Sequence, residues 1–128
     1  MFKDIHAFSS FSVDDLAAAK TFYGETLGLE VEPMSIGLNI TISGGGSIFV
    51  YPKSDHVPAT YTVLNFPVKN VDEAVDSLIA KGVTFEQYEG PMGTDDKGIC
   101  RPTEKGHGPT IAWFKDPARN FLAILEAM

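Results

Sequence analysis

The fold of this chain is decided by a stretch that occurs twice, FSVDDLAAA at residues 11–19 and FPVKNVDEA at residues 66–74. The two copies begin at residues 11 and 66, so their offset is 55 residues. The match continues beyond them, because GLEV at residues 28–31 reads like GVTF at residues 82–85. A repeat of this length predicts a single domain made of two similar modules, covering about residues 1–55 and about residues 56–128.

Each copy of the repeat begins in an alternating strand and continues into an amphipathic helix. Residues 5–13 are the first predicted strand, and residues 61–68 are its counterpart. We expect Asp14 to cap the first helix, because a carboxylate accepts hydrogen bonds from the free N–H groups of a helix N-terminus. Gly28 and Gly82 are expected to end the two helices.

Three short strand candidates follow each helix, separated by glycine, proline and polar residues. They lie at residues 30–34, 38–42 and 47–51, and at residues 84–88, 110–114 and 121–125. The predicted fold class is therefore α+β, with two tandem βαβββ modules. Residues 90–109 form the one long loop, which is either a lid that carries ligand contacts or a solvated segment.

Composition and charge exclude several classes of function. The chain has 128 residues, of which 44% are hydrophobic, and a net charge of −7, which opposes binding to nucleic acid or to an anionic membrane. Cys100 is the single cysteine, so neither an intramolecular disulfide nor a thiolate-rich metal site can form. We expect a cytoplasmic protein.

Several ordered motifs together resemble a known family. They are FSVDDL at residues 11–16, Phe-Tyr at 22–23, Leu-Gly at 27–28 and IAWFKDPARN at 111–120. In this order they are similar to the vicinal oxygen chelate superfamily, which includes glyoxalases, bleomycin resistance proteins and extradiol dioxygenases. The resemblance implies curved mixed sheets around a ligand pocket. One departure is Arg119, where the family usually has glycine.

The resemblance also indicates where a metal ion would be held, namely on the first, fourth, fifth and eighth strands. The corresponding positions are Phe8, Val63 and Ala123, and the fourth-strand segment at residues 46–51 contains no carboxylate. Such side chains do not ligate a divalent cation, which prefers imidazole and carboxylate groups. We therefore expect no metal and no cofactor.

Strand alternation predicts the residues that face the pocket instead. Residues two apart share a face, which places His6, Phe8 and Ser10 together on the first strand, opposite their repeat mates Tyr61, Val63 and Asn65. His6 has two readings, as a pocket residue or as an inert, hydrogen-bonded histidine at a strand start. His56 and His107 lie in loops and are expected on the solvated surface.

Two aromatic residues complete the predicted ligand-binding set. Trp113 lies where related fosfomycin-type proteins have a pocket aromatic, and it is either a stacking platform or a core residue. Tyr51 is likewise either a ligand-binding residue or a core residue. The catalytic residues, if any, are not identified.

The leading hypothesis is a metal-independent small-molecule-binding protein for drug or metabolite sequestration, with an aromatic or cationic ligand. The alternative is a glyoxalase- or dioxygenase-type enzyme, with acid/base chemistry around His6 and Tyr61 or with a divalent-metal site. A homodimer is expected, because one pair of modules in this superfamily commonly associates with a second.

Overall fold

The computed structural model describes residues 1–102 and 108–126, which form two compact units, Met1–Pro58 and Ala59–Met128. Each unit contains one four-stranded mixed sheet and one α-helix, and the α+β class is confirmed. In the described part of the chain, no helix is long and apolar enough to cross a membrane.

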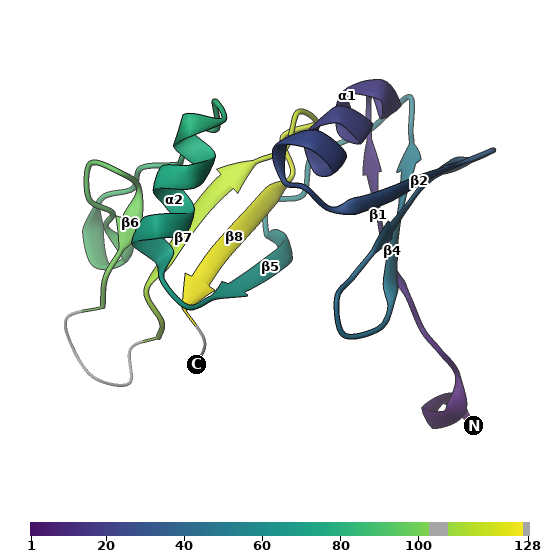
Figure 1. Cartoon of the computed structure of the whole chain (residues 1–128), viewed down its shortest axis with the longest axis horizontal. Helices are drawn as coiled ribbons and strands as arrows, with labels where there is room; N and C mark the ends of the chain where they lie inside the picture. The colour runs from purple at the N-terminus through teal and green to yellow at the C-terminus, as the bar shows by residue number, and fades with distance from the viewer. Residues whose placement is uncertain (103–107, 127–128) are drawn as a thin grey trace. The chain divides into compact units, whose positions relative to one another are not determined.

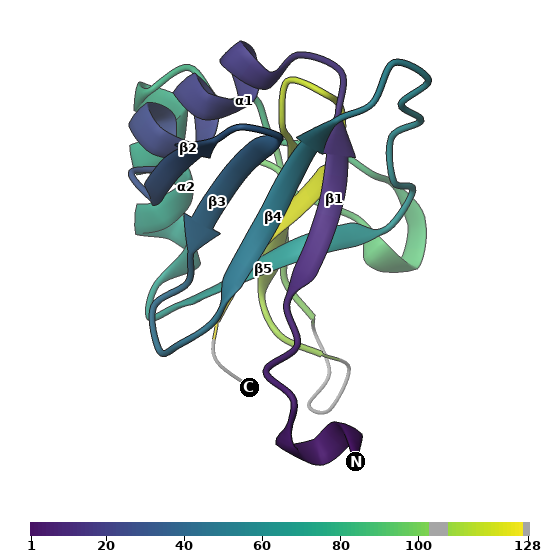
Figure 2. The same cartoon turned by 90° about the vertical axis from the view of Figure 1, so that its right-hand side faces the viewer.

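The first unit follows the predicted order of strand, helix and three strands. Its sheet has the strand order β1-β4-β3-β2, with β1 parallel to β4 and the other pairs antiparallel (Figure 2). The elements are β1 (Ser9–Val13), α1 (Leu16–Thr21), the π-helical turn η2 (Phe22–Thr26), β2 (Glu30–Met34), β3 (Gly37–Thr41) and β4 (Ser47–Pro52).

The second unit repeats this arrangement. Its sheet has the order β5-β8-β7-β6, with β5 parallel to β8, and α2 lies across one face of it (Figure 1). The elements are β5 (Thr62–Val68), α2 (Val71–Ala80), β6 (Ile99–Cys100), β7 (Ile111–Lys115) and β8 (Phe121–Glu126).

Strand alternation divides each sheet into a helix-covered face and an opposite face. In the first unit Phe11 and Val50 are paired and buried, and the Phe11 ring lies 5.8 Å from the ring of Tyr23, in the turn that continues α1. Phe49 and Tyr51 therefore belong to the opposite face, where their rings stack at 6.0 Å.

In the second unit a carboxylate identifies the covered face. The Val71 N–H at the start of α2 donates to Glu126 Oε2 at 3.1 Å, so the side of β8 that carries Glu126 faces the helix. Leu122 and Ile124 share that side and are buried. Trp113 pairs with Ala123 and therefore lies on the opposite face.

The predicted first strand is too long at its N-terminal end. Residues 5–8 precede β1, because β4 begins at Ser47 and the register pairs Ser9 with Ile48, which leaves almost no β4 for the earlier residues to pair with. The helix cap also differs from the prediction. Asp15, rather than Asp14, accepts the Ala18 N–H at 3.0 Å.

The segment between α2 and β7 is more structured than predicted. The strand expected at residues 84–88 is reduced to a single bridge between Phe85 and Phe114. The predicted loop contains β6 and the 3-10 turn η3 (Gly90–Met92). Gly98 is required there, because it has a φ of +87° and a Cβ atom on it would lie 2.6 Å from Phe85 Cβ.

The turn between β7 and β8 is held by two buried polar residues. Asp116 accepts both the backbone N–H of Asn120, at 2.8 Å, and its side-chain amide, at 3.1 Å. Arg119, which replaces the family's usual glycine, has a φ of 71°. This left-handed conformation costs a non-glycine residue roughly 1 kcal/mol.

Candidate functional site

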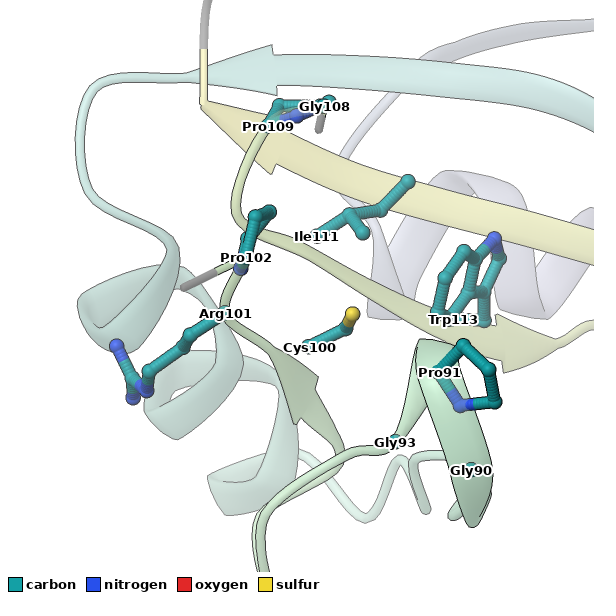
Figure 3. Close-up of a pocket in the computed structure, with 10 residues that line it drawn as sticks. All are labelled: Gly90, Pro91, Gly93, Cys100, Arg101, Pro102, Gly108, Pro109, Ile111 and Trp113. Atoms are coloured by element: carbon teal, nitrogen blue, oxygen red, sulfur yellow. The ribbon is translucent and has the colours of Figure 1, made fainter. Parts of the chain in front are cut away.

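A cavity of about 580 Å³ opens in the second unit, on the sheet face that α2 does not cover (Figure 3). Its walls come from β6, β7, the residues that adjoin these strands, and the 3-10 turn η3. The described lining residues are Gly90, Pro91, Gly93, Cys100, Arg101, Pro102, Gly108, Pro109, Ile111 and Trp113.

The two strands supply the apolar floor of this pocket. Ile111 and Trp113 are two residues apart on β7, so both project from the same face of the sheet. Cys100 is paired with Ile111 across the ladder, and its sulfur is turned toward Ile111 and Trp113 (Figure 3). An extended ligand lying along β7 would contact all three side chains.

Trp113 is half-buried and is supported by a second aromatic ring. The Tyr88 ring meets it edge-on, with centroids 5.7 Å apart and an interplanar angle of 70°. This geometry orients the indole while one of its sides lines the cavity. Burial, and secondarily the charge of Glu86, raise the pKa of Tyr88, so its phenol stays neutral at ordinary pH.

The turn before β6 is organised by Asp95. Its Oδ1 accepts the N–H groups of Lys97 and Ile99, each at 2.9 Å. Burial alone would raise the pKa of Asp95, but these bonds, together with Arg101, outweigh it and lower the pKa. Asp95 is therefore a carboxylate that fixes the approach to β6.

Arg101 is at the pocket rim, yet its charge is engaged elsewhere. The guanidinium donates to both oxygens of Asp72 on α2, from Nη1 at 3.0 Å and from Nη2 at 2.6 Å. These hydrogen bonds lower the pKa of Asp72 and raise that of Arg101. The pair is bidentate, the geometry in which a guanidinium is held most specifically.

Of the predicted ligand-binding residues, Trp113 lines this pocket, and Asn65 lies on the same face of the sheet. Asn65 and Trp113 both pair with Ala123, so they flank it. Ala123 is buried at 0% exposure and Asn65 is exposed.

The other predicted ligand-binding residues of the second unit, Tyr61 and Val63, do not follow simple strand alternation. The pairing of β5 with β8 shifts between Thr62 and Leu64, so Val63 is an inserted residue in a β-bulge. The two-residue spacing that linked Tyr61, Val63 and Asn65 is broken there. Tyr61 precedes β5 and is 70% exposed.

The other predicted residues belong to the first unit. His6 and Phe8 precede β1 and are exposed, Phe8 at 66%, and Ser10 is an exposed residue of β1. Tyr51 is half-buried on the face of the sheet opposite α1, beside Phe49.

The prediction for His56 is wrong. It is half-buried, and its Nδ1 lies 2.6 Å from Ser12 Oγ, within hydrogen-bonding distance. His107 lies outside the described residues. Within residues 1–102 and 108–126, no group of three or more His, Cys, Asp or Glu side chains is placed to hold a metal ion.

Sequence reasoning missed Pro91 as a pocket residue and Tyr88 as the ring that supports Trp113. Both lie where a strand and a loop were expected, and only the single bridge at Phe85 and the turn η3 bring them beside Trp113. The available signal was the aromatic residue directly before Glu89, Gly90 and Pro91.

A comparison with protein families gives one match. The model described as Glyoxalase/Bleomycin resistance protein/Dioxygenase superfamily matches residues 5–124. No curated protein matches the chain.

Solved structures share the fold at low sequence identity. An antibiotic binding protein, TnmS3, from Streptomyces sp. CB03234 is 23% identical, with 98% of each chain covered and a TM-score of 0.65. The fosfomycin resistance protein FosX from Listeria monocytogenes is 18% identical, with 95% of this chain and 92% of that chain covered and a TM-score of 0.70. A glyoxalase family protein from Enterococcus faecalis is 23% identical, with 98% of each chain covered and a TM-score of 0.68.

Proposed function

Because this chain belongs to the glyoxalase/bleomycin resistance protein/dioxygenase superfamily, we propose that it binds and sequesters a small drug or metabolite with a flat, apolar surface. The observation that carries this proposal is the pocket that Trp113, Ile111 and Pro91 line in the second unit. Binding needs no metal in this proposal, because the resemblance implies metal ligands at Phe8, Val63 and Ala123, whose side chains do not ligate a divalent cation.

The size and chemistry of the pocket support a small organic ligand. Its volume of about 580 Å³ is within the range of roughly 300–1,000 Å³ that is usual for such sites. The indole face offers a stacking surface for an aromatic ring. The antibiotic binding protein from Streptomyces, which has the same fold, is consistent with this class of ligand.

Fluorescence titration tests the proposal directly, because Trp113 is the only tryptophan of the chain. We expect neutral aromatic compounds, including polycyclic antibiotics and the naphthalene dye N-phenyl-1-naphthylamine, to quench or shift its emission saturably. The same compounds should raise the melting temperature, because ligands that bind the folded state stabilise it. Chelation with EDTA should leave both effects unchanged. A panel that neither alters the emission nor raises the melting temperature would contradict the proposal.

We also propose that the protein is a homodimer. The N-terminal segment extends beyond β1 (Figures 1 and 2). Its apolar side chains Met1, Phe2, Ile5 and Phe8 are exposed. Large apolar side chains exposed together in one short segment support an interface there. Sedimentation at micromolar concentration should give twice the chain mass of 13.9 kDa, and a monomer would refute this.

We further propose that the protein is cytoplasmic, on the basis of its composition. The net charge of −7 supports a role without nucleic acid or membrane surfaces as partners. The single cysteine, Cys100, is a free thiol, which fits the reducing cytoplasm.

A further inference from the structure

Arg101 is the charged side chain among the described residues that line the pocket. Its guanidinium makes three hydrogen bonds, two to Asp72 and one from Nη2 to Asp95 Oδ2 at 3.3 Å. Figure 3 shows the guanidinium pointing away from Cys100, Ile111 and Trp113. A ligand in the cavity therefore meets apolar side chains without meeting this positive charge.

The topology explains why Arg101 turns outward. β6 is an edge strand of only two residues, and Arg101 follows it directly. From this edge the side chain reaches Asp72, in the first turn of α2 on the helix-covered side of the sheet. Because Cys100 faces the pocket, alternation directs the next residue, Arg101, to the opposite face, and the bidentate bond holds its guanidinium there.

The two carboxylates that hold Arg101 are themselves well positioned. Asp95 is fixed through its other oxygen by the backbone of Lys97 and Ile99. Lys97 Nζ lies 3.6 Å from Asp72 and 2.8 Å from Asp76, one helical turn farther along α2. Asp76 therefore has the same charge as Asp72 and lies on the same helix, but in the ion pairs described it binds Lys97 and not Arg101.

We propose that the pocket selects uncharged ligands, and that Asp72 and Asp95 set this specificity by holding Arg101 outside it. This inference rests on the proposed function of the same pocket. With the guanidinium of Arg101 outside, an anion that entered would lose its hydration without gaining a counter-charge from the described lining residues, which is strongly unfavourable. The net charge of −7 adds long-range repulsion of anions. Asp72 and Asp95 are positioning residues, since they act on the ligand through Arg101.

A matched pair of probes tests this specificity. N-phenyl-1-naphthylamine is uncharged, and 8-anilino-1-naphthalenesulfonate has the same ring skeleton with one added sulfonate. With Trp113 emission as the readout, we expect the uncharged dye to bind the native protein at least about tenfold more tightly than the sulfonate.

Asp72→Asn should reduce this discrimination. Loss of the carboxylate releases the guanidinium toward the cavity, and we expect sulfonate affinity to rise about fivefold or more, with the affinity of the uncharged dye nearly unchanged. Asp76→Asn is the matched control, because it changes the net charge equally but leaves the bond between Asp72 and Arg101 in place. The double variant Asp72→Asn with Arg101→Met should restore the native discrimination.

Quenching of Trp113 by iodide and by acrylamide gives a second measurement that needs no ligand. Asp72→Asn should raise the iodide-to-acrylamide quenching ratio relative to Asp76→Asn. Equal binding of the two dyes by the native protein, or equal effects of the two substitutions on both measurements, overturns this inference alone. If neither dye nor the wider aromatic panel reaches Trp113, the proposed function fails, and this inference fails with it.

Discussion

Trp113→Ala is expected to abolish binding of aromatic ligands while leaving the protein folded. The indole is half-buried and lines the cavity, so its removal deletes the stacking surface. We expect affinity for N-phenyl-1-naphthylamine to fall at least about thirtyfold, or about 2 kcal/mol, which is the scale of a buried aromatic contact. The loss of folding stability should be smaller than the roughly 3–5 kcal/mol typical of a core tryptophan.

Dye fluorescence and calorimetry measure this variant, since it no longer contains tryptophan. Trp113→Phe keeps an aromatic surface and should retain most of the affinity. Phe22→Ala is the control for general destabilisation, because Phe22 is a half-buried aromatic of the first unit that packs on Tyr23, at a ring distance of 5.2 Å. Unchanged dye affinity in Trp113→Ala, or collapse of the fold, would return Trp113 to a purely structural role.

Asp116→Ala is expected to be the most destabilising polar substitution. Asp116 and Asn120 are 4% and 2% exposed, and the substitution removes the carboxylate that accepts two hydrogen bonds from Asn120. Losing two buried bonds to a charged acceptor should lower the free energy of unfolding by about 3 kcal/mol. Urea denaturation followed by circular dichroism measures this loss of unfolding free energy. Thermal unfolding should give a melting temperature lower by roughly 10 °C.

Two further variants serve as controls for this result. Asp116→Asn keeps one carbonyl oxygen as an acceptor and should lose less stability than alanine. Asp55→Ala removes a carboxylate whose pKa is lowered chiefly by a hydrogen bond from Lys53, but that ion pair is exposed and its loss should barely move the transition. Similar effects of Asp116→Ala and Asp55→Ala would show that the buried pair does not hold the hairpin.

Trp113, which was proposed from its position three residues before Asp116, lines the cavity of the second unit, because that spacing depends only on the register of one hairpin. Strand alternation is a weaker guide where its two-residue period is interrupted. Val63 lies in a bulge and residues 5–8 precede β1, so the alternation that grouped His6, Phe8 and Tyr61 does not extend through these segments.

The sequence by itself determined the repeat, the α+β class and the order of elements in each module, because strand and helix periods and glycine stops are local properties of the chain. It also showed Arg119 where the family usually has glycine, and the structure places that residue at a φ of 71°. Only the tertiary structure decided that residues 90–102 contain β6 and form a pocket wall, that Tyr88 supports Trp113, and that Asp72 turns Arg101 away from the cavity. These features join residues up to 29 positions apart through hydrogen bonds and ring contacts, which no local pattern of charges or apolar residues specifies.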